Sequence, residues 1–259
     1  AAPGPDAPRI VLTVQAPEVA PSAAVARRKN GRYVEALEAR GARAIALDER
    51  TDAATRTAAL RSMDGLLLTG GADVGPERYG EPVRDAVDVE PGRDTLEAEA
   101  FAAARARGVP ILGVCRGLQY LNVLMGGRLV QHVDDHGSPS YGTGPANQHP
   151  ITVLAGSRLA SILQPGAADD FELAVNTYHH QAVRPADLAA GLRASAFGES
   201  SLGPLVEGLE TADEPFFVAV QCHPERTEST PAAFDRLWDA FVAACRRPAA
   251  VTPGAGRPR

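Results

Sequence analysis

Short apolar segments alternate with stretches of helical apolar spacing through the first half of the chain. This alternation predicts a parallel β-sheet whose strands are joined by crossover helices. Strands are expected at 9–14, 44–47, 64–69 and 111–114, and helices at 27–40, 52–62, 94–107 and from just after Cys115 to Gly126–Gly127. Residues 72–93 are rich in Gly, Pro, Asp and Glu without periodicity. They are expected to form a long loop, and loops of that length are often functional.

The second half of the chain changes character. Short strands separated by turns are expected at 151–154, 172–176, 192–196, 205–210 and 216–221, with helices at 157–163 and 231–245. The expected fold class is therefore α/β: an open, mostly parallel sheet with helices on both faces, and a small antiparallel β element in the second half. With no repeat and no linker, a single domain is expected over 9–247, flanked by flexible tails at 1–8 and 248–259.

Composition narrows the class of protein. The 259 residues are 44% hydrophobic and 22% charged, which suits a folded globular chain, and the formal net charge is −6. An acidic chain offers no electrostatic footprint for nucleic acid, and its apolar runs fall far short of the roughly 18 residues that span a bilayer. Three scattered cysteines suggest no disulfide framework, so a cytoplasmic location is expected. Lys29 is the only lysine, which excludes a Walker A loop.

The sharpest local motif is Gly113-Val114-Cys115-Arg116-Gly117, at a predicted strand-to-helix junction. It has the form of a nucleophile elbow, in which a tight turn lifts the central side chain above the sheet and the glycines avoid clashes. A thiol at a helix N-terminus feels the positive end of the helix dipole, which favours the thiolate. A lone cysteine is otherwise most often a small buried hydrophobe. The glycines on both sides favour a nucleophile.

A cysteine nucleophile needs a base, and His223 follows the apolar strand predicted at 216–221. Glu225 is two residues further on, so in extended chain it projects to the same side and can fix the tautomer of the imidazole. Alone, this pair could equally be a surface histidine beside a solvated glutamate. Together with Cys115 it predicts a Cys-His-Glu triad.

Acyl chemistry also needs hydrogen-bond donors for a developing oxyanion. Gly70 and Gly71 follow a predicted strand and offer unencumbered backbone N–H groups, and the N–H of Arg116 comes directly after the cysteine. All of these lie at carboxyl ends of strands, where open parallel sheets bind ligands. On its own, the Gly-Gly pair would be an ordinary turn.

These motifs resemble the class I glutamine amidotransferase superfamily. Further stretches are similar to its γ-glutamyl-γ-aminobutyrate hydrolase branch: Pro91-Gly92-Arg93-Asp94 with Glu97, Cys115-Arg116-Gly117-Leu118-Gln119, Asn176-Thr177-Tyr178-His179-His180-Gln181 and Val206-Glu207-Gly208-Leu209-Glu210. The resemblance spans roughly residues 9–245. It implies a flavodoxin-like fold and hydrolysis of a γ-glutamyl amide through a γ-glutamyl thioester. By the same resemblance Cys115 is the nucleophile, His223 the general base and acid, and Glu225 its orienting partner.

The resemblance also implies substrate-binding positions. Gln119 and the backbone around Asn176 and Thr177 would hold the glutamyl head. Arg93 is a further candidate for a substrate contact, because the preceding Pro-Gly and the cap at Asp94 would fix its position, and His179 is expected to border the pocket with His180. One departure is that Cys222 stands where family members usually have Trp, which affects the leaving-group side of the pocket.

Six histidines raise the question of a metal site. His132 and His136 lie in a stretch rich in Gly, Ser, Asp and Pro, with His149 further along, and these are expected to be solvated loop residues. No metal and no cofactor are therefore predicted.

Two other functions would use the same residues. A glutaminase subunit would pass ammonia to a synthase partner and prefer glutamine, whereas a standalone hydrolase would act alone and accept a bulky amine. A non-catalytic binding protein on the same scaffold is disfavoured by the intact triad. The expected partner is a small γ-glutamyl molecule, and a homodimer is a common assembly in the family that the chain resembles.

Overall fold

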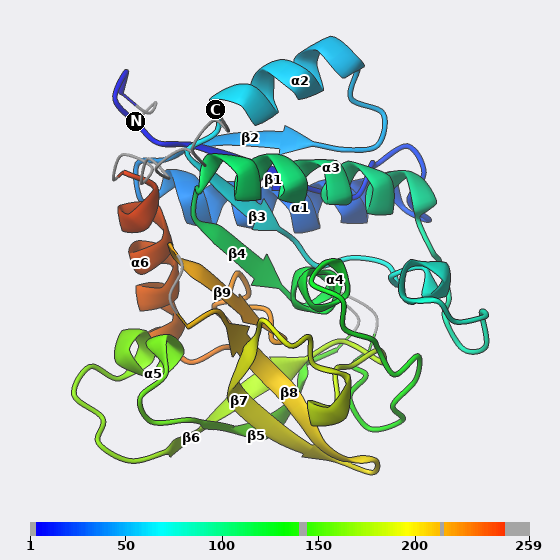
Figure 1. The fold of residues 1–259 in the computed structure, drawn as a ribbon, viewed down its shortest axis with the longest axis vertical. Helices are drawn as coiled ribbons and strands as arrows, with labels where there is room; N and C mark the ends of the chain where they lie inside the picture. The colour runs from blue at the N-terminus through cyan, green and yellow to red at the C-terminus, as the bar shows by residue number, and fades with distance from the viewer. Residues whose placement is uncertain (1–3, 140–143, 213–214, 247–259) are drawn as a thin grey trace, which may run out of the picture.

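A nine-stranded sheet in the order β2-β1-β3-β4-β9-β8-β7-β5-β6 forms the centre of the computed structural model (Figure 1), which describes residues 4–139, 144–212 and 215–246. The parallel part comprises β2 (Arg43–Leu47), β1 (Arg9–Thr13), β3 (Gly65–Leu68), β4 (Ile111–Val114) and β9 (Phe217–Val220). Its order is the one found in flavodoxin-like folds, so the predicted α/β fold class is confirmed.

Helices cover both faces of this parallel part, with α3 in front of the sheet and α1 behind it (Figure 1). The helices are α1 (Ala23–Glu38), α2 (Ala53–Ser62), α3 (Pro91–Arg107), α4 (Arg116–Leu124) and α6 (Asp235–Cys245). Successive strand side chains point to opposite faces and feed two cores. In β3, Leu66 and Leu68 join the core beneath α2, α3 and α4, whereas Leu67 joins the core beneath α1 and α6.

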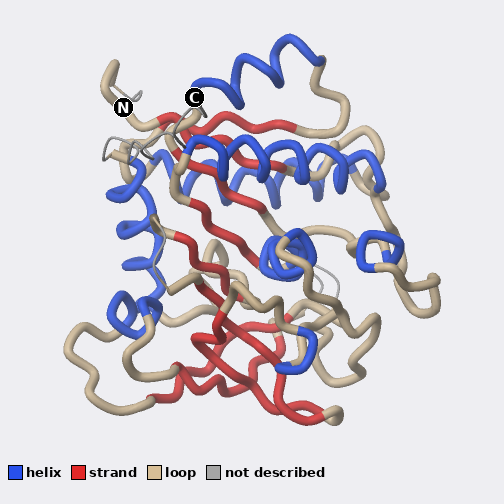
Figure 2. Tube along the Cα trace, in the orientation of Figure 1, coloured by secondary structure: helices blue, strands red, loops and turns tan. Residues whose placement is uncertain are grey.

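The second half adds the predicted antiparallel element, seen at the lower end of the sheet in Figure 2. It comprises β8 (Gly203–Glu210), β7 (Arg193–Ser200), β5 (Asn147–Val153) and β6 (Phe171–Thr177), with α5 (Arg158–Leu163) packed on it. β5 starts earlier than predicted, at Asn147 instead of residue 151. Proline has no N–H to donate a hydrogen bond to a neighbouring strand. β7 pairs with β5 only from Ile151 onwards, so Pro150 interrupts no hydrogen bond between β5 and β7.

Helix starts also differ from the prediction. The side chain of Ser22 accepts a hydrogen bond from the N–H of Val25, so α1 begins at Ala23 and not at residue 27. Pro91 takes the first turn of α3, where its missing N–H costs nothing, so that helix begins three residues before Asp94. Short 3₁₀ helices complete the structure at Pro76–Tyr79, Pro185–Asp187 and Ala232–Phe234.

The long loop expected at 72–93 contains one of these 3₁₀ helices and is otherwise irregular. The tail predicted at 248–259 and the first three residues lie outside the described residues. Within the described ranges, no helix combines the length and the apolar character needed to cross a membrane.

Candidate active site

The carboxyl ends of β3, β4 and β9 meet at one edge of the sheet and carry the predicted chemistry. Gly70 and Gly71 follow β3, Cys115 follows β4, and His223 lies three residues beyond the end of β9. Parallel pairing of these strands therefore brings together residues that are far apart in the sequence.

Cys115 occupies a strained turn. Its φ of 51° and ψ of −105° are unusual for a residue with a side chain, and it is buried at the N-terminus of α4. A Cβ on Gly117 would lie 2.1 Å from the carbonyl oxygen of Leu68, and one on Gly113 would lie 2.7 Å from the Leu121 side chain. Both flanking glycines are thus required by close packing around the turn, the geometry of a nucleophile elbow.

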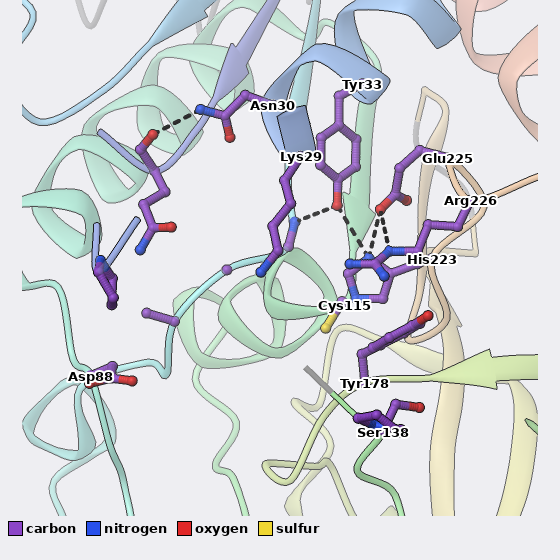
Figure 3. Close-up of a pocket in the computed structure, with 16 residues that line it drawn as sticks. Lys29, Asn30, Tyr33, Asp88, Cys115, Ser138, Tyr178, His223, Glu225 and Arg226 are labelled. Carbon is purple, nitrogen blue, oxygen red and sulfur yellow. Dashed lines mark hydrogen bonds and ion pairs between the residues drawn. The ribbon is translucent and has the colours of Figure 1, made fainter. Parts of the chain in front are cut away.

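His223 faces the cysteine and is held from behind (Figure 3). Its Nδ1 lies 2.7 Å from Oε1 of Glu225 and 3.4 Å from the Tyr33 hydroxyl, and the Cys115 thiol is a further hydrogen-bond partner of the imidazole. Because Nδ1–H donates to the carboxylate, Nε2 is left to exchange a proton with sulfur. The Tyr178 ring packs edge-on against the imidazole at 5.5 Å between centroids, which restricts its rotation.

The electrostatics of this group favour a charged imidazole. Burial opposes protonation of His223, but Glu225 and Cys115 outweigh it and raise the pKa of His223 to about 9. Burial also opposes ionisation of Glu225, yet His223 lowers the pKa of that carboxyl overall. At neutral pH the imidazolium is therefore the stable form, which suits a thiolate nucleophile beside it.

Two cavities meet at Cys115. The larger, of about 340 Å³, lies under α1 and is lined by Lys29, Asn30 and Arg226 among others. The smaller, of about 170 Å³, is lined by Asp88, Gln119 and His179 among others. A bond placed across the thiol could thus have one side in each cavity.

The sequence profile of Peptidase C26 matches residues 13–225. The chain belongs to the Peptidase C26 family. This confirms the class I glutamine amidotransferase resemblance.

Two relatives of this Peptidase C26 chain have names that point to different activities. Rv2859c of Mycobacterium tuberculosis, whose name assigns it provisionally to the glutamine amidotransferases, is 36% identical over 213 residues, covering 80% of this chain and 66% of that protein. The chain thus spans just under two thirds of the length of that relative. PuuD of Escherichia coli K12, named gamma-glutamyl-gamma-aminobutyrate hydrolase, is 33% identical over 201 residues, covering 72% of this chain and 74% of PuuD.

A solved structure supports the fold. The glutaminase domain of Trypanosoma brucei CTPS, with bound acivicin, matches at a TM-score of 0.62 and 18% identity, covering 92% of this chain and 93% of that domain. At this identity the likeness shows a shared fold.

The predicted oxyanion donors in this Peptidase C26 chain lie beside the cysteine, but they are not equivalent. The N–H of Gly70 donates to the Tyr33 hydroxyl at 3.1 Å, so it is already engaged. Gly71 lines both cavities. Arg116 is the first residue of α4, where backbone N–H groups lack partners within the helix. Gly71 and Arg116 therefore remain the better predicted donors.

Arg93 does not contact the pocket, contrary to the prediction. It is buried behind the glycine turn, where Nη2 donates to the carbonyl oxygens of Thr69 and Gly70 at 3.1 and 3.0 Å. Its Nε donates to Glu97 at 2.9 Å, and the Arg116 side chain pairs with Glu97 and Asp94. Glu90 lies 3.6 Å from Arg93 and Arg78 lies 3.7 Å from Asp94, so the network holds three arginines and three carboxylates. It supports the turn and the elbow from below.

Of the remaining predicted substrate residues, two contact backbone groups of other segments and two line the smaller cavity. Asn176 grips the backbone of His223: its Oδ1 accepts from the His223 N–H at 2.8 Å, and its Nδ2 donates to the His223 carbonyl at 3.1 Å. Thr177 donates to the carbonyl of His136 at 2.6 Å. The structure thus gives both side chains positioning contacts. Gln119 and His179 line the smaller cavity.

Several pocket residues escaped the sequence analysis. Lys29 and Tyr33 come from α1, whereas Tyr178 and Arg226 stack 3.9 Å apart beside His223. Burial lowers the pKa of Lys29. The sole lysine of an arginine-rich chain was a signal that could have pointed to this position. The others carried no signal beyond the neighbouring motifs.

Cys222, which stands where Trp is usual in the family, packs into the core shared with α1 and α6 and lines neither cavity. Burial raises its pKa well above the ordinary value for a thiol, so it stays protonated at neutral pH. Only Cys115 combines exposure to the cavities with a base.

The histidines expected in solvated loops behave differently from one another. The His132 side chain is 46% exposed, as predicted. His136 is buried, contrary to the prediction, and lies against His149 and His179, with ring centroids 4.7 and 5.1 Å away. Burial lowers the pKa of His179 to about 4, so its imidazole is neutral at physiological pH.

Proposed function

We propose that this Peptidase C26 protein hydrolyses γ-glutamyl amides through a γ-glutamyl thioester on Cys115. The observation that carries the proposal is a buried thiol in a strained elbow, backed by the His223–Glu225 pair and open to two cavities. Cys115 is the nucleophile, His223 the general acid and base, and Glu225 its orienting partner.

The reaction proceeds in two steps. The Cys115 thiolate attacks the δ-carbonyl carbon, forming a C–S bond, while the N–H groups of Gly71 and Arg116 hold the oxyanion. The intermediate collapses, the C–N bond breaks, and His223 gives its proton to the leaving amine. His223 then takes a proton from water, whose oxygen attacks the thioester. Breakage of the C–S bond releases glutamate and restores the thiolate.

The lining of the cavities supports a leaving amine that carries an acid group. Lys29 and Arg226 bring two positive charges to the larger cavity, which suits a carboxylate. Of the two acids that also line it, Glu225 is paired with His223 and Asp88 lines both cavities. Asp73 and Asp88 give the smaller cavity negative charge, which suits the α-amino group of the glutamyl head. A γ-glutamyl-γ-aminobutyrate substrate satisfies both conditions, and PuuD, a relative of this chain, is named for that activity.

The test is a substrate panel on the purified chain, read as glutamate released. γ-Glutamyl-γ-aminobutyrate is expected to be hydrolysed at least about 10-fold faster, by kcat/KM, than γ-glutamyl-n-propylamide, which lacks the carboxylate and so about 1.4 kcal/mol or more of binding. Cys115→Ala should lower turnover by at least about 10⁴-fold, while the control Cys222→Ala should retain it.

Other outcomes would overturn this assignment. Turnover of glutamine alone would favour a glutaminase that serves a synthase partner; the name of Rv2859c assigns that relative provisionally to the glutamine amidotransferases. Full activity in Cys115→Ala would exclude the mechanism, and a folded chain that hydrolyses none of the amides would favour a binding protein.

A further inference from the structure

A cluster of buried imidazoles and one carboxylate lies beside the active site and plays no part in the proposed reaction. Its members are His136, His149, His179 and Glu207, and one ligand atom from each lies within 4.8 Å of all the others. His136 comes from the segment between α4 and β5, His149 from β5, His179 from the residues after β6, and Glu207 from β8.

The polar atoms at the centre of this cluster have no hydrogen-bond partners. They include Nε2 of His136, His149 and His179 and both carboxylate oxygens of Glu207. Glu207, His136 and His179 are each more than nine-tenths buried. A buried carboxylate with no donor is costly, because desolvation is not repaid by any bond. The nearest imidazole nitrogens lie 3.5 and 3.8 Å from the carboxylate oxygens, so a cation that accepts several lone pairs at once would satisfy these atoms better than the side chains do.

The outer side of the cluster is arranged as around a metal. Nδ1 of His136 lies 2.9 Å from the Asp135 carboxylate, and Nδ1 of His179 lies 2.9 Å from the carbonyl oxygen of Gln181. Each contact takes the Nδ1 proton and leaves the Nε2 lone pair directed at the centre. Histidine ligands in metal sites are oriented by outer contacts of this kind.

The space around the cluster is also shaped by a glycine. A Cβ on Gly198 of β7 would lie 2.9 Å from the His149 ring and 3.0 Å from Cγ of Glu207. Any larger residue would push these two side chains out of place. Nε2 of His149 and Oε2 of Glu207 are 3.5 Å apart, and Nε2 of His179 and Oε1 of Glu207 are 3.8 Å apart. Tetrahedral zinc with bonds of about 2.0–2.2 Å places its ligand atoms about 3.3–3.6 Å apart.

We propose that His136, His149, His179 and Glu207 bind one Zn²⁺ ion as a closed, structural site. Three imidazole nitrogens and a carboxylate suit Zn²⁺, and four protein ligands leave no position for water or substrate. The ion joins β5, β8, the residues after β6 and the segment between α4 and β5. His179 is adjacent to Tyr178, which packs on His223, so the site fixes one wall of the catalytic pocket.

The test measures metal binding directly and does not depend on the proposed hydrolase activity. The full chain is stripped with a chelator, checked by circular dichroism, and titrated with Zn²⁺ or Co²⁺. One ion per chain by elemental analysis and a four-coordinate Co²⁺ visible spectrum are expected. Thermal unfolding should rise by about 5–10 °C at a zinc concentration roughly 100-fold above Kd.

A matched pair of variants locates the site. His149→Gln removes the most exposed ligand and should weaken zinc binding, measured by competition with a chromophoric chelator, at least about 100-fold. His132→Gln changes an exposed histidine of the neighbouring segment and should bind zinc as the wild type does. A folded, stripped wild type that takes up neither ion would overturn the proposal and leave a protonated histidine as the partner of Glu207. Equal zinc affinity in His149→Gln would overturn it as well.

Discussion

At the scale of single residues, the ionisation of His223 follows from Glu225. The carboxylate and the thiol raise the pKa of His223 to about 9, so the imidazolium that we propose protonates the leaving amine persists at neutral pH and is lost as the pH rises through about 9. In Glu225→Gln only burial and the thiol remain, and the alkaline limb of the kcat/KM profile should move to lower pH. The rate itself should fall by up to about 10⁴-fold. An alkaline limb at unchanged pH in the variant would contradict this role for Glu225.

At the scale of elements, α3 carries the buried carboxylates that hold the glycine turn and the elbow together. Glu97 pairs with both Arg93 and Arg116, so Glu97→Ala leaves two buried guanidinium groups without it. The free energy of unfolding should fall by about 3–5 kcal/mol, measured by urea denaturation. Glu99→Ala, on the same helix, removes only a partly exposed pair with Arg56 and should cost less than about 1 kcal/mol. Equal losses in the two variants would mean that the buried network does not stabilise the fold.

At the scale of the whole molecule, Asn176 joins the antiparallel element to the catalytic loop. Its side chain, on β6, hydrogen-bonds to the backbone N–H and carbonyl of His223. His223 follows β9, and three strands, β8, β7 and β5, lie between β9 and β6 in the sheet order. Asn176→Ala should lower kcat about 10–100-fold with little change in KM, because the base is displaced but the cavities remain. Glu172→Ala, at an exposed position of the same strand, is the control. A change confined to KM would make Asn176 a substrate-binding residue instead.

The expected homodimer and cytoplasmic location stay predictions. Analytical ultracentrifugation of the purified chain would test the homodimer.

The local pattern of apolar residues, glycines and spacings in the sequence determined most of the secondary structure and the location of the candidate site. Apolar periodicity predicted the parallel strands and most helices, because burial on both faces of a sheet demands it. The glycines around Cys115 and the His223–Glu225 spacing predicted which residues meet at the candidate active site, since parallel strands must present their carboxyl ends at one edge. Two elements begin earlier than predicted. The Ser22 cap starts α1 at Ala23, and β5 starts before Pro150 because that proline lies outside the part of β5 that pairs with β7.

Only the tertiary structure decided which way the polar side chains face. The sequence around Arg93 is the same whether its side chain contacts a substrate or a buried carboxylate. Its partners are Glu97, one turn further along the same helix, and Thr69, which follows β3. His136 sits in a polar stretch typical of a surface loop, yet it is buried because β5, β6 and β8 converge around it. Charge and burial of a long polar side chain depend on neighbours distant in the chain, and periodicity carries no information about them.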